Sequence, residues 1–361
     1  MQRLETPHGG AAAPTRDGGE VVLGRYRMVR RIGAGGFGVV WLAEDLNLHR
    51  TVAVKRIVLA DAATAARAER AARAAARLSH PAIVALYESG RDDEAVYLVS
   101  ELVRGRSLAE LECDGLLSDR DVVRAGIALC DALAHAHRRG VVHRDVKPAN
   151  VIVPDDPAPG GGIVKLTDFG VAHMSGDDAL TATGDVVGTL AYMAPEQAEG
   201  REVDARTDLY ALGLVLYEAL SGVNPVRARG AASTARRVGA RMPPLGRLRR
   251  DLSPALCAAV DAAVLPHPAE RGTIADLRAG LAAALDDVAD EVGTIAGSPL
   301  EGLGAPPAAR RPTPLRARLA AAAAAGALGA AALAWLGPAP PVPPLAGGAA
   351  VAAAVALLPL L

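Results

Sequence analysis

Residues 33–40 read Gly33-Ala34-Gly35-Gly36-Phe37-Gly38-Val39-Val40, and Val52-Ala53-Val54-Lys55 follows. Glycines at this spacing let backbone N–H groups approach phosphate oxygens without a Cβ in the way. Dinucleotide-binding folds share the spacing, but there a helix follows the loop directly and an acidic residue stands about 20 positions on. Here a β-branched run follows, which predicts a strand and places Lys55 on the next strand, within reach of a phosphate. The sequence therefore argues against a dinucleotide enzyme.

Short β-branched runs around this loop predict strands over Tyr26–Ile32, Val39–Glu44, Thr51–Val58, Ile83–Tyr87 and Ala95–Glu101. Between them, Ala60–Leu78 is rich in Ala and Arg and predicts a helix. After Gly105 the pattern becomes helical, over Asp121–Arg138, Asp208–Leu220, Pro254–Val264 and Ile274–Leu285. A β-rich first third followed by a helical remainder predicts an α+β chain with two lobes.

The composition of the 361-residue chain is nearly neutral, with 39 Lys and Arg residues against 40 Asp and Glu residues. This balance excludes a protein that coats nucleic acid through a large positive excess. Aromatic residues make up only 3 %, so the core must be built from Ala, Val and Leu. Cys113, Cys130 and Cys257 lie far apart, which predicts a reducing compartment and neither disulfides nor a zinc site. Residues 1–24 lack an apolar run, which predicts a flexible arm and no signal peptide.

Three further motifs follow in order along the chain. They are His143-Arg144-Asp145-Val146-Lys147-Pro148-Ala149-Asn150, then Asp168-Phe169-Gly170 after an expected strand over Ile163–Thr167, and then Ala194-Pro195-Glu196. Their order and spacing resemble the signature of the eukaryotic-type serine/threonine protein kinases of bacteria, over about residues 25–286. The resemblance implies a two-lobed protein kinase fold. Its small antiparallel β lobe, with one main helix, would cover residues 25–103, and a larger, mainly helical lobe would cover residues 104–286.

The resemblance also implies how the chain transfers a phosphoryl group from ATP to Ser and Thr hydroxyls of proteins. Asp145 accepts the proton of the attacking hydroxyl, and Lys147 faces the γ-phosphate. Asn150 and Asp168 supply oxygen ligands for Mg²⁺, or for Mn²⁺, which bridges the phosphates. Lys55 holds the α- and β-phosphates. Phosphoryl transfer depends on positioning and charge neutralisation, and these residue types supply both.

The remaining ATP-binding residues are implied in the same way. They are Gly33, Gly35, Gly36, Phe37 and Gly38 of the loop, the apolar adenine slot of Val40, Ala53 and Ile152, and the hinge from Glu101 to Val103. Ser100 stands at the back of this pocket, and its small size predicts that bulky adenine analogues are admitted.

Other motif residues are expected to hold the structure together. Asp208 is expected to brace the catalytic loop, and Glu196 to pair with Arg271 in the helical lobe. His143 is expected to pack rather than to act as a base. Pro225–Arg250 holds eight arginines and no acid, and three interpretations stay open: a protein-docking surface, a solvated face, and contact with anionic lipid.

Regulation is expected in the loop that follows Asp168. Thr181 and Thr183 stand near its tip, where members of the resembling family autophosphorylate, and a phosphate there would find Arg144 nearby. Thr189 resembles the threonine that helps to position the acceptor.

The chain departs from the resembling family at one position. In that family a helix Glu, nine residues before the His of a Ser-His-Pro turn, pairs with the strand Lys. Here the turn is Ser79-His80-Pro81 and the position is Ala71. Glu69 is two residues off, about 200° around a helix, and is expected to pair with Arg73 in solvent. A nucleotide-binding pseudokinase scaffold is therefore the alternative, although the otherwise intact catalytic set favours an active enzyme.

The C-terminal part of the chain is apolar. After a linker over residues 287–318 with four arginines near its end, Leu319–Leu336 and Leu345–Leu361 carry no charge. A helix of about 18 residues spans about 27 Å, close to the hydrocarbon thickness of a bilayer. We expect a hairpin over residues 319–361 to anchor the chain in the cell membrane, with the kinase domain in the cytoplasm because the arginines precede it. An Ala-rich soluble packing helix is the alternative, and a fragment of a longer multispanning protein fits the pattern too.

Overall fold

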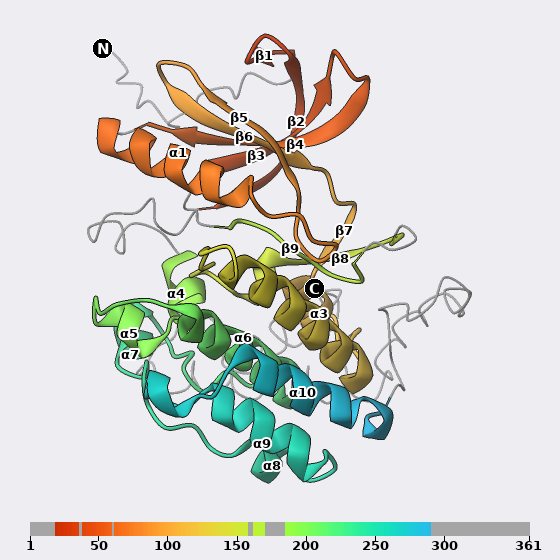
Figure 1. The fold of residues 1–361 in the computed structure, drawn as a ribbon, viewed down its shortest axis with the longest axis vertical. Helices are drawn as coiled ribbons and strands as arrows, with labels where there is room; N and C mark the ends of the chain where they lie inside the picture. Colours follow the sequence, from red (N-terminus) through yellow and green to blue (C-terminus); the bar gives the residue numbers. More distant parts are fainter. Residues whose placement is uncertain (1–18, 36–37, 60, 158–161, 170–184, 290–361) are drawn as a thin grey trace, which may run out of the picture. The chain divides into compact units, whose positions relative to one another are not determined.

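The computed structural model describes residues 19–35, 38–59, 61–157, 162–169 and 185–289 (Figure 1). The chain divides into two compact units, residues 1–299 and 300–361, and the second unit lies outside the described residues. Within the first unit, a sheet with one helix forms a small lobe, and the helices that follow form a larger lobe. This is the two-lobed α+β arrangement that the sequence predicts.

The small lobe is one antiparallel sheet in the order β1-β2-β3-β4-β6-β5. Its strands are β1 (Val21–Val22), β2 (Tyr26–Gly35), β3 (Gly38–Asp45), β4 (Arg50–Val58), β5 (Leu86–Arg91) and β6 (Ala95–Glu101). The strand predicted over Ala95–Glu101 is confirmed at both ends. The strand predicted over Ile83–Tyr87 exists but lies further along the chain, because β5 runs over Leu86–Arg91. The apolar residue Ile83 is buried outside the sheet, where it forms an isolated β-bridge with Leu166 of the large lobe.

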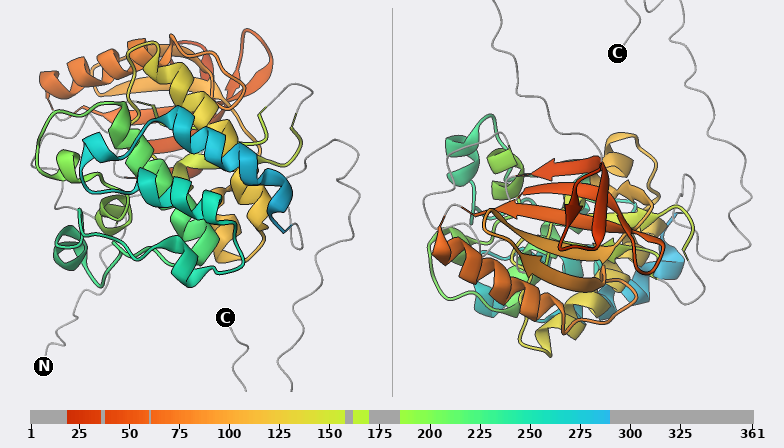
Figure 2. Two further views of the ribbon diagram at one scale, coloured as in Figure 1. Left: turned by 60° about the horizontal axis from the view of Figure 1, so that its bottom comes forward. Right: turned by 90° about the horizontal axis from the view of Figure 1, so that it is seen from above.

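The two faces of this sheet bury different side chains, because side chains alternate along a strand. On β4, Val54 points into an apolar cluster around Tyr26, so its neighbour Lys55 points to the opposite face. Helix α1 (Ala62–Ala75) covers that opposite face, where its Ala68 belongs to a second apolar cluster. Figure 2 shows α1 lying along the sheet. Lys55 therefore faces the side of the sheet on which α1 lies.

The prediction of a flexible arm over residues 1–24 is wrong at its C-terminal end. Val21 and Val22 form β1, which pairs with the first residues of β2. Val22 is 4 % exposed and belongs to the cluster around Tyr26. A two-residue strand carries no periodic pattern, so the sequence gives no sign of it. Residues 1–18 lie outside the described residues.

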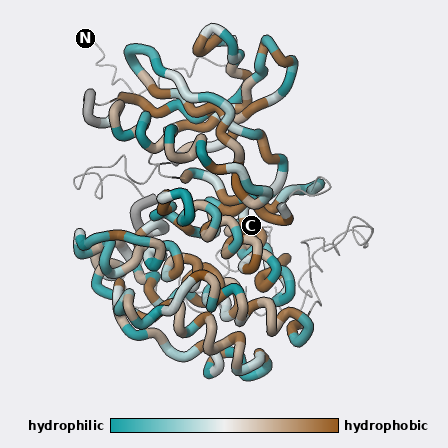
Figure 3. Tube along the Cα trace, viewed as in Figure 1, coloured by the Kyte–Doolittle hydropathy of each residue, from teal (hydrophilic) through white to brown (hydrophobic). Residues whose placement is uncertain are grey.

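The large lobe packs around α6 (Ala205–Ser221), which is buried along most of its length. The other helices are α2 (Leu108–Cys113), α3 (Asp119–His137), α4 (Asp185–Leu190), α5 (Pro195–Ala198), α7 (Ala231–Ala235), α8 (Leu245–Leu248), α9 (Pro254–Ala263) and α10 (Ile274–Ala284). The four predicted helices correspond to α3, α6, α9 and α10, which contact one another. Figure 3 shows hydrophobic and hydrophilic stretches alternating along the chain. The core is mainly Leu, Val and Ala, as the low aromatic content predicts.

A second sheet, in the order β7-β8-β9, carries the segments next to the site. Its strands are β7 (Gly105–Ser107), β8 (Val151–Pro154) and β9 (Lys165–Leu166), so the strand predicted over Ile163–Thr167 is shorter than expected. β7 and β8 approach so closely that a Cβ at Gly105 would lie 2.1 Å from the carbonyl oxygen of Val153. Only glycine fits where the chain passes from the small lobe into the large one.

The three cysteines are free, as expected. Cys130 and Cys257 are buried and Cys113 is exposed. Burial raises the pKa of the Cys130 thiol to about 12. A thiol of this kind is a poor nucleophile near neutral pH, so Cys130 is a core residue.

The described part of the chain contains no helix with the length and hydropathy needed to cross a membrane. The apolar hairpin predicted over residues 319–361 lies outside the described residues, as does most of the linker before it.

Candidate active site

The predicted catalytic residues meet around the carboxylate of Asp145, which is 8 % exposed. Its Oδ2 lies 2.9 Å from Lys147 Nζ and accepts a hydrogen bond of 3.0 Å from Asn150 Nδ2. Asn150 also donates to the carbonyl oxygen of Asp145 at 2.8 Å. Both bonds use the amide nitrogen of Asn150, so neither of them uses its amide oxygen. The structure thus brings together three of the four residues predicted to be catalytic.

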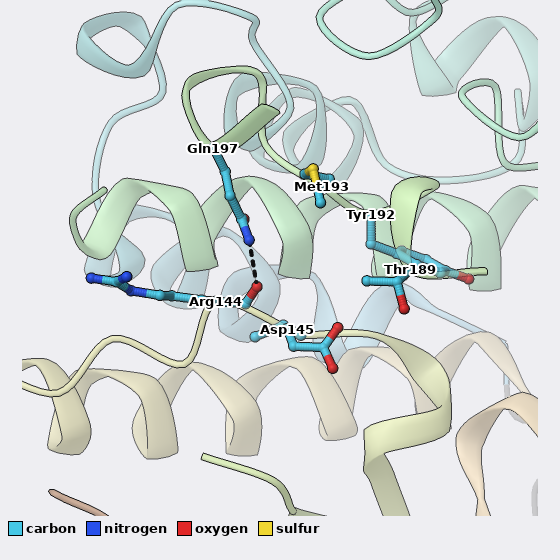
Figure 4. A pocket seen from close by; sticks show the side chains of 7 residues that line it. Arg144, Asp145, Thr189, Tyr192, Met193 and Gln197 are labelled. Carbon is cyan, nitrogen blue, oxygen red and sulfur yellow. Dashed lines mark hydrogen bonds between the residues drawn. The ribbon is translucent and has the colours of Figure 1, made fainter. Parts of the chain in front are cut away.

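Thr189 of α4 joins this cluster, since its Oγ1 accepts a hydrogen bond of 2.9 Å from Lys147 Nζ. A small recess opens beside it, lined by Arg144, Asp145, Val146, Thr189, Tyr192, Met193 and Gln197 (Figure 4). Gln197 Nε2 closes one side by donating to the carbonyl oxygen of Arg144 at 3.1 Å. A recess next to a buried carboxylate and an ammonium group suits a hydroxyl group that has to lose its proton.

Asp208 braces the catalytic loop, as expected. Its side chain is fully buried and accepts hydrogen bonds from the backbone N–H of His143 (2.8 Å), the backbone N–H of Arg144 (2.7 Å) and His137 Nε2 (2.7 Å). Arg144 has a φ of +69°, a left-handed conformation that costs a non-glycine residue about 1–2 kcal/mol. The bonds from Asp208 offset that cost and hold the turn that presents Asp145.

His143 packs, as expected, and links two motifs. Its ring lies 4.5 Å from the ring of Phe169 in an edge-on arrangement, and its Nε2 bonds to the carbonyl oxygen of Thr167 at 2.8 Å. These contacts hold Asp168 between Thr167 and Phe169, with a left-handed φ of +65°. The packing therefore sets where the Asp168 carboxylate points.

Lys55 of β4 reaches across from the small lobe to Asp168 of the large lobe. Its Nζ lies 2.8 Å from Asp168 Oδ1, and the two side chains are 11 % and 30 % exposed. The pair joins the residue predicted to hold the α- and β-phosphates to a predicted metal ligand.

Helix α1 offers Lys55 no carboxylate. Ala71 is 8 % exposed and occupies the position where the resembling kinases carry their helix Glu. Glu69 is 39 % exposed and lies 3.9 Å from Arg73 and 3.5 Å from Arg91. The expected solvent-side pairing of Glu69 with Arg73 is confirmed.

The glycine-rich loop is described except for two residues. Gly33 and Gly35 lie at the end of β2, Gly38 begins β3, and Gly36 and Phe37 lie outside the described residues. Gly38 has a φ of +130°, and a Cβ there would lie 2.3 Å from the carbonyl oxygen of Arg56. Glycine is therefore required where β3 turns in against β4.

The residues predicted to form the adenine slot lie on adjacent strands. Val40 pairs with Lys55 across β3 and β4, and Ala53 pairs with Ser100 across β4 and β6. Ile152 lies on β8, and Val103 follows β6. The resemblance predicts an adenine or phosphate contact for each of these residues, and each side chain is half-buried. Their contact with adenine stays a prediction.

Lys165 of β9 contacts the predicted hinge, and the sequence alone assigns it no role there. Its Nζ lies 2.9 Å from Glu101 Oε2, and the same oxygen accepts a hydrogen bond of 3.3 Å from the backbone N–H of Ala85. The sequence predicts Glu101 for its place in the hinge, and in the structure its side chain links the end of β6 to β9. The sequence feature that could have pointed to Lys165 is the scarcity of lysine, because the chain has only three and the other two belong to predicted site motifs.

Glu196 and Arg271 form the expected ion pair in the large lobe. Arg271 Nη1 and Nη2 donate to Glu196 Oε1 and Oε2, each at 2.7 Å, and both side chains are almost completely buried. Burial opposes ionisation, but the hydrogen bonds from Arg271 hold the pKa of Glu196 below its ordinary value. The pair anchors α5, which follows the segment that lines the recess.

The predicted metal ligands are suited to a metal ion that binds together with the phosphates of ATP. Among the described residues, no three His, Cys, Asp or Glu side chains gather to bind a metal ion. Asn150 and Asp168 offer two hard oxygen ligands from the two motifs. Mg²⁺ is commonly held by one or two protein oxygens together with substrate phosphates and water, so this donor set suits it.

The comparisons with known proteins agree with this geometry. The protein kinase domain model matches residues 26–271. The chain is 39 % identical over 269 residues to the serine/threonine-protein kinase PknB of Mycolicibacterium smegmatis, and 40 % identical over 270 residues to PknB of Mycobacterium tuberculosis. It is 38 % identical over 222 residues to the serine/threonine-protein kinase PrkC of Bacillus subtilis, covering 60 % of this chain and 33 % of PrkC. The chain therefore belongs to the protein kinase family, in its bacterial eukaryotic-type serine/threonine branch.

The alignments with both PknB proteins cover 71 % of this chain and 42 % of each relative. The chain thus spans about two fifths of the length of these curated relatives. Their names give no support to the alternative of a pseudokinase scaffold.

Proposed function

We propose that this chain transfers the γ-phosphoryl group of Mg·ATP to Ser and Thr hydroxyls of proteins, its own loop included. The observation that carries the proposal is the arrangement at Asp145. One carboxylate oxygen contacts both Lys147 Nζ and Asn150 Nδ2, and Lys147 extends the cluster to Thr189. This arrangement supports a proton acceptor and a cation held side by side at a recess.

In this proposal, Asp145 takes the proton of the acceptor hydroxyl. The acceptor oxygen forms a bond to the γ-phosphorus while the bond from that phosphorus to the ADP oxygen breaks, and ADP leaves. Lys147 and Lys55 carry the compensating positive charge beside the phosphates. When bound, Mg²⁺ neutralises charge on the transferring phosphoryl group. Asn150 and Asp168 would hold it.

The test is phosphate incorporation by the purified chain with Mg·ATP, mapped by mass spectrometry, with Asp145→Asn as the matched control. We expect phosphate on Thr181 or Thr183 in the parent and none in the variant. Both threonines lie outside the described residues. A thermal shift with Mg·ATP but no phosphate on any residue or added protein would contradict the proposal and favour a nucleotide-binding scaffold.

We also propose that residues 319–361 anchor the chain in the cell membrane, with the kinase domain of residues 25–286 in the cytoplasm. The support is the sequence alone, in two uncharged segments preceded by four arginines. The full chain should resist carbonate extraction from membranes, whereas a chain ending at residue 318 should be released. Release of both would contradict the anchor.

A further inference from the structure

The described residues after α6 carry a concentrated positive charge. No Asp or Glu stands between Glu218 and Asp251, whereas Pro225–Arg250 contains eight arginines. Some arginines elsewhere in the molecule pair with carboxylates, as Arg27 does with Glu44 and Arg278 with Asp131. The positive charge of Pro225–Arg250 cannot be neutralised from within the segment.

The first part of this segment lies beside the recess that Asp145 and Thr189 line. Arg227 Nη2 donates a hydrogen bond of 2.8 Å to the hydroxyl of Tyr192, which lines the recess. Helix α7 contacts α4, the helix that carries Thr189. Further along, a Cβ at Gly239 would lie 3.4 Å from the ring of Pro195. Residues 227–239 therefore lie next to the segment from Thr189 to Pro195, and Arg241 stands two residues further along the chain.

The arginines of the segment fall into two groups. Arg227 pairs with Glu218, Arg249 pairs with Asp119 and Asp251, and Arg237 donates to backbone carbonyl oxygens. By contrast, Arg229, Arg236 and Arg241 are exposed, and within the described residues none of them has a carboxylate at ion-pair distance. Arg236 Nη2 donates a hydrogen bond of 3.2 Å to the Ser233 hydroxyl.

We propose that Arg229, Arg236 and Arg241 form a surface that binds acidic residues of the protein substrate, so that the enzyme prefers acceptors flanked by Asp or Glu. This inference rests on the proposed kinase function. A substrate whose hydroxyl enters the recess at Asp145 must lay its flanking residues on the surroundings of that recess. Exposed guanidinium groups without local partners attract carboxylates there and steer their approach.

The position next to the recess favours a substrate over a lipid surface. Anionic lipid would need basic groups but no particular relation to the acceptor. The segment itself contains the matched control, because Arg247 and Arg250 are equally exposed and free of carboxylate partners among the described residues. They lie in or next to α8, which packs against α9 and which Figure 1 places at the lower end of the large lobe, away from α4.

The experiment compares two peptides with one acceptor, flanked by four Glu or by four Gln residues, as substrates of the purified full chain. We expect a kcat/KM ratio of Glu to Gln peptide of about 10 or more in the parent. The triple variant Arg229→Glu/Arg236→Glu/Arg241→Glu should bring the ratio to about 1 or below, and Arg229→Gln/Arg236→Gln/Arg241→Gln should lie between. The double variant Arg247→Glu/Arg250→Glu should keep the parent ratio.

Binding is measured separately, by the anisotropy of a labelled Glu peptide in which Ala replaces the acceptor. If no peptide is phosphorylated but this binding depends on the three arginines, the kinase function fails and the surface stands. A parent without preference for the Glu peptide in both assays overturns the inference, and so does an equal loss in the double variant. The inference is also overturned if the three arginines are needed to bind phosphatidylglycerol vesicles while the enzyme uses both peptides equally well. That result would assign the surface to lipid.

Discussion

Lys55 Nζ lies 2.8 Å from Asp168 Oδ1, and within the described residues this is the one carboxylate at ion-pair distance from it. In the resembling kinases a helix Glu shares this lysine. The chain therefore holds the lysine of its small lobe through Asp168, which is also a predicted metal ligand. Binding Mg·ATP must loosen the contact that positions Lys55.

The substitution Ala71→Glu should supply the missing partner. Ala71 is buried on α1, which covers the sheet face on which Lys55 lies. We expect kcat/KM for ATP to rise roughly 3- to 10-fold, as one partly buried ion pair would give. Initial-rate kinetics check this, with Glu69→Gln as the control because Glu69 pairs with Arg73 and Arg91. Loss of activity in Glu69→Gln would show that the helix register is wrong.

The hydroxyl of Thr189 should be needed for full phosphoryl-transfer activity. Replacing it with Val removes the acceptor of the 2.9 Å hydrogen bond from Lys147 and keeps the side-chain shape. We expect kcat to fall about 10-fold or more, because Lys147 loses one of its two fixed contacts. Thr189→Ser keeps the hydroxyl and should stay within about 3-fold of the parent. If kcat, measured at saturating ATP, falls in Thr189→Ser but not in Thr189→Val, the methyl group and not the hydrogen bond is what counts.

Glu196→Gln should destabilise the large lobe strongly, because it leaves Arg271 buried without its countercharge. Removing one partner of a buried pair costs about 3–5 kcal/mol. Asp131→Asn breaks the exposed pair with Arg278 and should cost about 0.5 kcal/mol or less. Urea unfolding of the two variants checks the difference. Similar free energies of unfolding would show that the buried pair contributes no more than an exposed one.

Glu112 of α2 should make stability depend on pH. Burial, and then the nearby charge of Glu218, raise the pKa of Glu112 from 4.5 to about 8, and its Oε1 is buried with no hydrogen-bond partner in the described part of the chain. Between these two pH values the unfolded chain loses this proton and the folded chain keeps it. Stability should therefore fall as pH rises from about 4.5 to about 8 and then level off.

Glu112→Gln removes the titration and keeps the size of the side chain. At pH 8 the variant should be more stable than the parent by roughly 4 kcal/mol, and the gain should shrink towards pH 5. Thermal melting at both pH values checks this. A gain that is equal at pH 5 and pH 8 would exclude the ionisation of Glu112 as its cause.

The sequence predicts the fold best where a periodic pattern is long. α3, α6, α9 and α10 lie within three residues of their predicted bounds at each end, and so does β6. The errors fall where the pattern is short or has two explanations. β1 has two residues, and the apolar run at Ile83 serves contact with Leu166 rather than a strand in the sheet.

The site is predictable where its residues share one loop, and less so where distant segments meet. The spacing of Asp145, Lys147 and Asn150 already implies their contact. By contrast, Lys165 and Glu101 stand 64 residues apart, and nothing in either local pattern points to the other. Arg227 and Tyr192 are a similar case, at 35 residues. Such pairs depend on how the two lobes and their helices pack.

The three lysines of this chain stand at or next to residues predicted to bind nucleotide, and each ammonium group lies 2.8–2.9 Å from a carboxylate. Elsewhere the positive charge is carried by arginine. Amine-acylating reagents, which spare guanidinium groups, therefore find their side-chain targets only at this site. In most proteins such reagents label lysines over the whole surface. Here the acylation of three lysines, compared with and without nucleotide, would report whether nucleotide is bound.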